Sequence, residues 1–362
     1  MKARRCTAVL MTAAVALAAS ALPVAAQSTA PGTATGRGRD DDVTIRLVTH
    51  DSFAISKKVL RDFTRRTGID VEVLPAGDAG AALNQVILTK DDPIGDVLFG
   101  VDNTFLSRAL TEDIFLKADV PNAKAVPAAL RLDPSDRAVP IDHGAVCVNY
   151  DKQWFEDHDL AVPRTLGDLT KPKYRDLLVV ENPATSSPGL AFLLATVDRF
   201  GEGGWQKYWS TLRENGVEVV NGWEEAFNGS FSGGEGNGDR PLVVSYASSP
   251  PVAVYFSDPQ PKESPIGTVL GTCFDQIEFA GVLRGTDHPA AARKLVNFML
   301  SKRFQEDIPL QMFVFPARPD AQLPAVFEKF AEIPHDPATL PPETIGEHRE
   351  QWIDEWTDTV LR

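Results

Sequence analysis

The chain has 362 residues, with 36 basic and 50 acidic side chains and a formal net charge of −14 at pH 7. Such an excess of negative charge repels nucleic acids and anionic membranes, which excludes both as partners. The length exceeds what one hydrophobic core usually serves, so two lobes are expected.

Residues 1–26 have the features of a secretory signal peptide. Basic side chains near the start precede a small, apolar run over residues 8–22, and small residues precede the predicted cleavage after Ala26. A membrane anchor is the alternative, but the run is short and alanine-rich against the ~20 residues that a spanning helix needs. Residues 27–42 lack apolar periodicity and predict a flexible leader. The mature protein is therefore expected in the periplasm or another extracytoplasmic space.

The first folded segment alternates strands with helices. Residues 43–50 alternate apolar and polar side chains, as a strand does. Residues 54–68 have helical spacing and end at Gly68, where a helix C-cap favours glycine. Alternating strands and helices predict an α/β lobe with a parallel sheet. The further elements expected here are strands at 69–76 and 95–101 and helices at 79–90 and 104–115.

The remainder of the chain continues this pattern. Residues 288–308 predict one strongly amphipathic helix, and residues 346–361 predict a final helix. Trp352 and Trp356 lie one turn apart in the final helix, as residues that pack in a core or between lobes would. The strands expected in between are 138–151, 176–184, 241–250 and 273–285.

Several loops follow the carboxyl ends of these apolar strands, which is where open α/β sheets bind ligands. One of them, "TSSPG" at residues 185–189, stands at the head of a hydrophobic helix. Thr185 or Ser186 is expected to cap that helix, with proline near its first position. Capping leaves spare hydroxyl groups to face a crevice.

Motifs for catalysis, metals and phosphates are absent from the sequence. It has no G-x-S-x-G, C-x-x-C, H-E-x-x-H or G-x-x-x-x-G-K-[ST] pattern. A serine hydrolase using Ser186 or Ser187 stays open as an alternative without a histidine partner identified. No metal and no cofactor is expected. Cys147 and Cys273 either form a disulfide or are two separately buried thiols.

Aromatic and acidic residues in the loops predict a different kind of site. Trp223 directly follows Gly222 where a loop enters a helix, and a loop tryptophan near a cleft stacks on flat rings or cations. The alternative is that this indole belongs to the core. Together with Asp51, Asp78 and Tyr246, it would suit a planar cationic heterocycle.

In combination, these segments resemble the thiamine-binding periplasmic proteins, a branch of the type II solute-binding proteins that serve ABC importers. The resemblance runs from about Val43 to the C-terminus. It is carried by "THDSFAISK", "GDAGAALNQ", "DVLFGVDNTFL", "PIDHGAVCVNYDK", "NPATSSPGLAFLL", "NGWEEAF", "VVSYASSP" and "REQWIDEW", in this order.

The resemblance implies a type II periplasmic-binding-protein fold with two α/β lobes joined by hinge strand crossovers. Lobe 1 would comprise residues 43–140 and about 280–362, and lobe 2 residues about 141–279. A monomer would close on thiamine or a thiamine phosphate and pass it to the membrane permease of an ABC importer, without catalysis. The alternatives are another ligand on the same scaffold, namely a polyamine, ferric ion or oxyanion, or the serine hydrolase.

The family pattern also implies which residues contact the ligand. His50, Asp51 and Phe313 are further candidates, because relatives carry tyrosine in place of His50 and tryptophan in place of Phe313. The contacts implied by the matching motifs are Asp78, Ala79, Ser186, Ser187, Trp223, Tyr246, Ala247, Ser248, Ser249 and Pro250.

Overall fold

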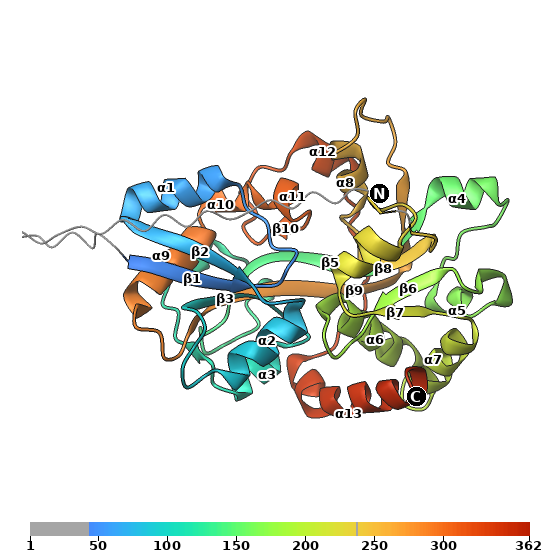
Figure 1. Ribbon diagram of the computed structural model, residues 1–362, viewed down its shortest axis with the longest axis horizontal. Helices are drawn as coiled ribbons and strands as arrows, with labels where there is room; N and C mark the ends of the chain where they lie inside the picture. Colours follow the sequence, from blue (N-terminus) through green and yellow to red (C-terminus); the bar gives the residue numbers. More distant parts are fainter. Residues whose placement is uncertain (1–42, 237) are drawn as a thin grey trace, which may run out of the picture. The chain divides into compact units, whose positions relative to one another are not determined.

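The computed structural model describes residues 43–236 and 238–362, so the predicted signal peptide and leader lie outside the described residues. The strands of this part of the chain are β1 (Val43–Thr49), β2 (Ile69–Pro75), β3 (Val97–Asp102), β4 (Phe115–Leu116), β5 (Val139–Asp151), β6 (Leu178–Glu181), β7 (Glu218–Val220), β8 (Leu242–Tyr246), β9 (Ile266–Leu283) and β10 (Phe315–Pro316). They form one sheet in the order β2-β1-β3-β9-β5-β8-β6-β7, with β10 beside β5 and β4 beside β9 (Figure 1).

Helices lie between most of the strands. The α-helices are α1 (Lys57–Thr67), α2 (Ala79–Leu88), α3 (Leu106–Thr111), α4 (Lys152–Asp157), α5 (Leu166–Leu169), α6 (Ser187–Phe200), α7 (Gly204–Glu214), α8 (Pro250–Tyr255), α9 (Pro289–Met299), α10 (Lys302–Gln305), α11 (Ile308–Gln311), α12 (Ala325–Phe330) and α13 (Pro342–Val360). Short 3₁₀ helices are η1 (Pro121–Ala125), η2 (Ala128–Leu130) and η3 (Pro172–Tyr174), and η4 (Glu225–Ser230) is a π-helix. Within the described residues, no helix is both long and apolar enough to cross a bilayer.

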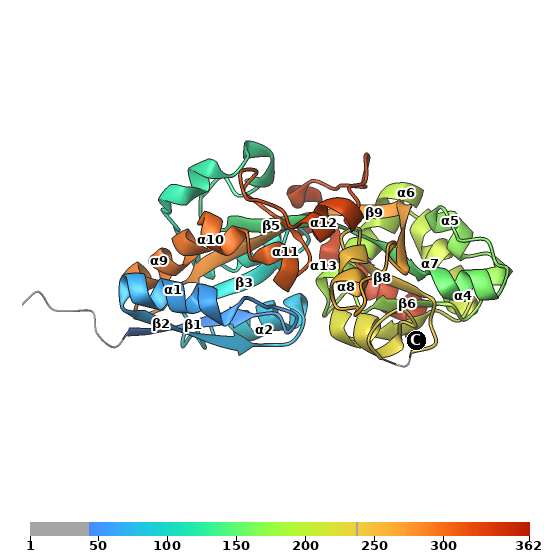
Figure 2. The same ribbon diagram turned by 90° about the horizontal axis from the view of Figure 1, so that it is seen from above.

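The strand β1 is buried on both faces only at residues 47–49, because Thr44 and Arg46 are exposed at its start. Ile45 and Leu47 join one core cluster with Phe63 of α1 and Leu295 of α9. Val48 belongs to a second cluster with Leu83 of α2. Side chains alternate across a strand, so successive residues pack against helices on opposite sides of the sheet. Figure 2 shows α1 and α9 next to one another on one of these sides.

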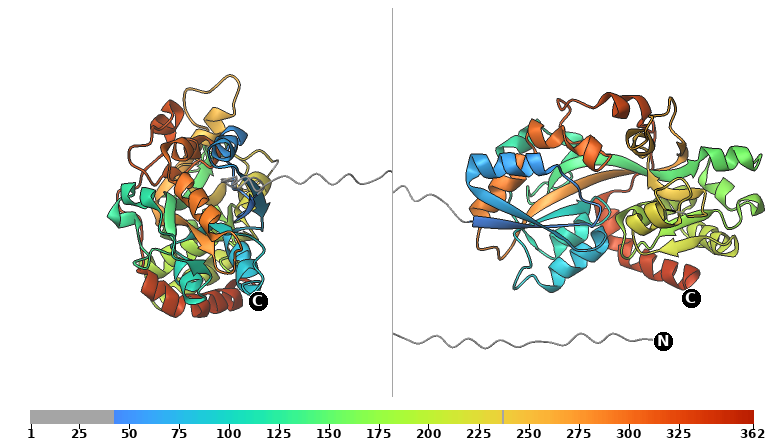
Figure 3. Two further views of the ribbon diagram at one scale, coloured as in Figure 1. Left: turned by 90° about the vertical axis from the view of Figure 1, so that its left-hand side faces the viewer. Right: turned by 45° about the horizontal axis from the view of Figure 1, so that its top comes forward.

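The strands of the first segment are parallel, as the sequence predicted, but the complete sheet is mixed. β1 pairs in parallel with β2 and β3, as expected, but β3 pairs antiparallel with β9. β5 and β9 pair antiparallel over most of their lengths. In Figure 1 and on the right of Figure 3, these two long strands run side by side and connect β1–β3 with β6–β8.

Two predicted helices are shorter than the sequence pattern indicated. The amphipathic stretch 288–308 is not one helix but α9, α10 and part of α11, because Ser301 interrupts it and accepts a hydrogen bond from the Phe304 N–H at 3.4 Å. The helix expected at 104–115 ends at Thr111, since Asp113 has a φ of 53° and Phe115 pairs with β9. Local capping and sheet pairing therefore override apolar periodicity in both places.

The C-terminal helix α13 contacts helices on both sides of the sheet's long strands. Near its start, the Arg349 guanidinium lies 5.2 Å from the centre of the Phe105 ring, beside α3. Farther along, Trp356 packs edge-on against Trp209 of α7 at 5.5 Å, and Gln206 donates a 2.8 Å hydrogen bond to Glu355. Trp352 and Trp356 are buried packing residues, as predicted. The helix is the red one near the C label in Figures 1 and 3.

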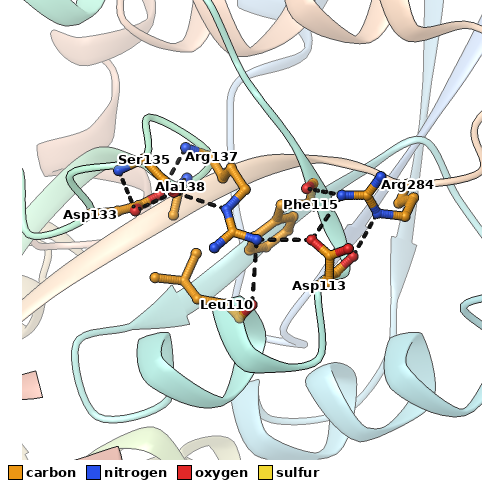
Figure 4. Close-up of polar contacts among 8 residues, drawn as sticks. All are labelled: Leu110, Asp113, Phe115, Asp133, Ser135, Arg137, Ala138 and Arg284. Carbon is orange, nitrogen blue, oxygen red and sulfur yellow. Dashed lines mark hydrogen bonds and ion pairs between the residues drawn. The ribbon is translucent and has the colours of Figure 1, made fainter. Parts of the chain in front are cut away.

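A polar network fixes the segment that leads from α3 to β5 (Figure 4). Asp113 accepts hydrogen bonds from Arg284 at 2.8 Å and from Arg137 at 2.9 Å. Arg137 also donates to the Leu110 carbonyl at 3.4 Å, and its own backbone N–H donates to buried Asp133 at 2.8 Å. The arginines lower the pKa of Asp113, Arg284 most strongly. The network holds the irregular segment against the end of β9.

A disulfide joins the two long strands. Cys147 of β5 and Cys273 of β9 are bonded, with 126 residues of separation along the chain. Both sulfur atoms are buried in a small cluster with Ala145 and Ala247. The bridge therefore closes a long loop at the centre of the sheet, where it restricts the unfolded chain.

We expect the double variant Cys147→Ala/Cys273→Ala to lower the free energy of unfolding by about 2–4 kcal/mol in urea denaturation, because the unfolded chain regains loop entropy. Dithiothreitol should lower the stability of the wild type by a similar amount and leave the double variant unchanged. Equal stability of wild type and double variant would contradict this role of the bridge.

Candidate ligand-binding site

A cavity of 310 Å³ lies where several strand-end loops meet. Its wall is formed by the loops after β1, β2, β7 and β8, by the start of α6, by η4 and α8, by β9 and by the segment after α11. The loops that the sequence singled out after its apolar strands therefore converge, as expected for an open α/β sheet. The polar and aromatic side chains that line the cavity include His50, Asp78, Ser187, Trp223, Tyr246, Phe256, Gln276, Glu278 and Phe313.

Asp78 joins two parts of the cavity wall. It caps α2, accepting a hydrogen bond from the Ala79 N–H at 2.6 Å. Its other oxygen accepts from the Trp223 N–H at 2.9 Å, across 145 positions of sequence. Gly222 permits this approach, because a Cβ there would lie 3.1 Å from the Asp78 carboxylate. Burial raises the pKa of Asp78, while these N–H donors lower it.

Trp223 offers an aromatic face to the cavity. Its indole stacks on Phe227 with 4.9 Å between ring centres and 15° between planes. The indole N–H donates to Ser245 Oγ at 2.9 Å, which fixes the ring orientation. The side chain is half-buried and lines the cavity, so it is not simply a core residue.

Ser186 and Ser187 have different surroundings. Ser186 is the N-cap of α6 and accepts from the Gly189 N–H at 3.4 Å, which is the capping role the sequence predicted. Ser187 lines the cavity and donates to Asp102 at 2.6 Å. Gln276 donates to the same pair, at 2.9 Å to Ser187 and 3.2 Å to Asp102. Ser187 thus has a carboxylate and an amide as partners, whereas a serine nucleophile needs a base such as histidine.

Aromatic rings stand at the other side of the cavity. Phe313 and Phe256 both line it, with 5.8 Å between their ring centres, and Tyr255 packs against both. Phe313 has a φ of 55°, a left-handed conformation that a bulky side chain rarely adopts. Phe256 is 61% exposed, which is unusual for a phenylalanine. Two aromatic rings, inclined to one another by 54°, are therefore available in the cavity wall together with its acidic side chains.

His50 carries positive charge into this acidic surrounding. Its Nε2 lies 3.2 Å from Glu278 Oε1, and its Nδ1 lies 3.0 Å from Ser52 Oγ. Burial alone would lower the pKa of His50, but Glu278, Asp78 and Asp51 together raise it above its usual value. Among the residues that line the cavity in the described part of the chain, His50 is the one basic side chain.

Further buried carboxyl groups lie at or behind the wall. Burial raises the pKa of Asp102, and it raises the pKa values of Asp142 and Glu181 far above their usual range. A neighbouring carboxylate adds to the effect at Asp142, through Glu278, and at Glu181, through Asp78. A raised pKa favours the neutral form of these buried acids, so they add little negative charge. The wall itself carries five acidic side chains, Asp51, Asp78, Glu224, Glu235 and Glu278, against His50, which favours a positively charged ligand.

The structure brings most of the predicted contact residues together. The predicted residues that line the cavity are His50, Asp51, Asp78, Ala79, Ser187, Trp223, Tyr246, Ser249 and Phe313. Ser186, Ala247, Ser248 and Pro250 are instead buried behind the wall. They support the loops that carry Ser187 and Ser249 rather than facing the cavity.

Sequence reasoning missed the residues that reach the cavity from within β9. Gln276 and Glu278 line it, and both belong to an apolar strand. Their signal was present: two polar residues at a spacing of two mark one face of a strand. Phe227 and Phe256 were also missed, because an isolated phenylalanine has no sequence feature that separates a cavity wall from a core.

The cavity therefore has the walls of a reversible binding site for a small organic cation. No cluster of three or more metal-ligating side chains occurs in residues 43–236 and 238–362. The combination of an enclosed hollow, ring faces and a few oriented polar groups is typical of small-molecule sites. The fold and the cavity together define a ligand-binding protein of the cleft type.

Comparison with known proteins identifies the family. The family model of the bacterial extracellular solute-binding proteins matches residues 92–332, and the chain belongs to this family. A thiamine-binding periplasmic protein of Salmonella typhimurium (strain LT2) is 29% identical over 323 residues, covering 88% of this chain and 94% of the relative. This agrees with the family resemblance drawn from the sequence motifs.

Solved structures share the fold. A periplasmic thiamin binding protein superposes with a TM-score of 0.78 at 27% identity, covering 90% of this chain and 99% of that one. A ferric binding protein from Campylobacter jejuni superposes with a TM-score of 0.69 at 17% identity, covering 87% and 99%. The predicted periplasmic-binding-protein fold is confirmed.

The raised pKa of His50 is measurable by NMR. We expect the imidazole signal of His50 to titrate at a higher pH than that of His143, whose pKa burial lowers. His50→Gln and His143→Gln assign the signals. A midpoint for His50 below that of His143 would contradict the ion pair with Glu278.

The raised pKa of His50 also determines how its contribution to the free energy of unfolding changes with pH. Because the folded pKa of His50 is raised, its contribution to the free energy of unfolding is fully present below the unfolded pKa of ~6.5 and is lost as the pH rises through the folded pKa. Urea denaturation of wild type and His50→Gln should therefore differ most at low pH.

Proposed function

We propose that this protein captures thiamine in the cavity described above and delivers it to the membrane permease of an ABC importer. The observation that carries the proposal is the cavity wall itself, in which an indole and phenylalanine rings stand beside buried carboxylates. Thiamine is a cation with two flat rings, an aminopyrimidine and a thiazolium joined by a methylene group, and such ligands favour aromatic faces and nearby negative charge. The names of the most similar relatives support the same ligand.

The proposed contacts follow from the geometry. Trp223 offers a stacking face that Phe227 and Ser245 hold in place. Asp78 supplies negative charge close to the same face. Ser187 and Ser249 stand where hydroxyl groups would orient the hydroxyethyl end of the ligand.

The ligand would be enclosed between two lobes, residues 43–140 with about 280–362 and residues about 141–279. The strand order supports this division, since β2-β1-β3 lies on one side of the β9-β5 pair and β8-β6-β7 on the other. The hydrogen bonds from Trp223 to Asp78 and from Ser187 to Asp102 would then join the two lobes. The long strands β5 and β9 pass between the two sets of strands and would act as the hinge. A monomer exported to the periplasm by a cleaved signal peptide would suit this role.

Release of an unchanged ligand, rather than catalysis, is the function that the site favours. Ser187 bonds to Asp102 and Gln276, so no histidine base serves it. Ser52, His50 and Glu278 do form a hydroxyl–imidazole–carboxylate chain. The nearby Ala79 and Trp223 N–H groups, however, already donate to Asp78 and are not free to stabilise an oxyanion.

Other ligands on the same scaffold are tested by the same experiment. A ferric ion lacks a suitable cluster of ligands among the described residues, and an oxyanion would meet several carboxylates. A polyamine shares the positive charge of thiamine but has no ring to stack. Aromatic walls therefore favour thiamine over a polyamine.

Isothermal titration with thiamine should give saturating heat with one site per chain, and thiamine should raise the melting temperature as ligand binding to the folded state requires. Spermidine, ferric citrate and inorganic phosphate serve as comparison ligands. Recovered thiamine should be chemically intact. No heat and no thermal shift at millimolar thiamine would count decisively against the proposal.

Replacing Trp223 by alanine should weaken thiamine binding by about 1–3 kcal/mol, because a stacking face is lost. Trp223→Phe should keep most of the affinity. Trp154→Ala is the matched control, since Trp154 stacks on His158 outside the cavity. Unchanged affinity in Trp223→Ala would remove this indole from the site.

A further inference from the structure

Three carboxyl groups stand in one row across the centre of the sheet. In the register of β3, β9 and β5, Glu278 lies opposite Asp102 on one side and opposite Asp142 on the other. Residues paired in this way point to the same face of a sheet. The middle residue, Glu278, is the member of the row that lines the cavity.

The neighbours of Glu278 fix its position. His50 Nε2 lies 3.2 Å from Glu278 Oε1, and Ser52 in turn lies 3.0 Å from His50 Nδ1. Both His50 and Glu278 are nearly buried, with side-chain exposures of 12% and 11%. An ion pair with so little exposure holds its geometry better than a surface pair does.

Asp142 stands behind Glu278 and is fully enclosed. It is 1% exposed, and its Oδ2 has no hydrogen-bond partner among the described residues. Burial, and after it the proximity of Glu278, raises the pKa of Asp142 well above its usual value, which favours the protonated form beside Glu278. The other titratable groups around Glu278 are His50, Asp51, Asp78, Asp102, Asp142 and Tyr246.

Glu278 and Asp78 differ in how much hydrogen-bond acceptor capacity remains for a ligand. Each oxygen of Asp78 already accepts a backbone N–H, from Ala79 and from Trp223. No backbone N–H of the described residues donates to the Glu278 side chain, whose partners there are the His50 imidazole and the Asp142 carboxyl group. A carboxylate can accept about four hydrogen bonds, so Glu278 is the better acceptor for a donor on the ligand.

We propose that Glu278 accepts a hydrogen bond from the exocyclic amino group of the bound aminopyrimidine, and that His50 and Asp142 are the residues that position it. This inference rests on the proposed function. The thiazolium ring carries its charge without an N–H group, so it requires no oriented acceptor. The amino group does, and a charge-assisted hydrogen bond to a partly desolvated carboxylate gives strong discrimination.

The test compares thiamine with oxythiamine, in which an oxo group replaces the amino group. Wild type should bind thiamine at least about 10-fold more tightly, because the oxo group presents an acceptor to the Glu278 carboxylate. In Glu278→Gln, thiamine affinity should fall and oxythiamine affinity should hold or rise, since the new amide can donate. The preference for thiamine should therefore shrink by about 10-fold or more.

Asp275→Asn is the control, because it removes a carboxylate from the same strand outside the cavity, and it should leave the preference unchanged. Asp142 is tested as a positioning residue. Asp142→Ala should shrink the preference for thiamine, whereas Asp142→Asn keeps a hydrogen-bonding group of the same shape beside Glu278 and should retain most of that preference. Circular dichroism and thermal melting check that each variant is folded.

The outcomes separate this inference from the proposed function. If wild type binds neither ligand, the thiamine proposal fails. If wild type binds both equally, or if Glu278→Gln weakens both by the same factor, thiamine binding stands and the assigned role of Glu278 is wrong. If Glu278→Gln does not fold, Glu278→Ala takes its place, and an undiminished preference for thiamine in that variant would overturn the role of Glu278.

Discussion

The antiparallel pairing of β5 with β9 is the interaction on which the rest of the structure depends. It joins the β1–β3 set to the β6–β8 set and carries the disulfide between Cys147 and Cys273. Its register also places Asp142 beside Glu278 and turns Gln276 toward Ser187. A shift by one residue would turn these polar side chains to the opposite face, so the pairing determines both the frame and the chemistry of the cavity.

Burying carboxyl groups costs free energy of desolvation, which the protein offsets in several ways. Asp78 and Asp102 are stabilised by backbone N–H groups and hydroxyls. The raised pKa of Asp142 favours its neutral form, and the raised pKa of His50 favours the imidazolium form beside Glu278. The cavity wall still holds five acidic side chains against the single imidazole of His50 in the described part of the chain. A cation entering the cavity would offset this excess of negative charge, so charge as well as shape explains the site.

Much of the fold and about half of the site followed from sequence, and the residues show why. Strand-end loops such as those at Asp78 and Trp223 are recognisable because turn residues, hydroxyls and aromatics interrupt apolar strands. Gln276 and Glu278 were not identified from the sequence. Their spacing shows that they share one face of a strand, but only the strand register shows that this face meets the cavity. The helix break at Ser301 was not predicted either, because a single capping serine within an amphipathic run has the same sequence pattern as a solvent-facing helix residue.

The helix α13 adds a mechanical condition to any hinge motion. It is attached near Arg349 to the α3 side and near Trp356 to the α7 side. Rotation about β5 and β9 would therefore strain or detach one of these ends. If β5 and β9 act as the proposed hinge, the contacts of α13 would oppose their rotation, and a substitution in α13 would alter how widely the protein opens without touching any residue that meets the ligand.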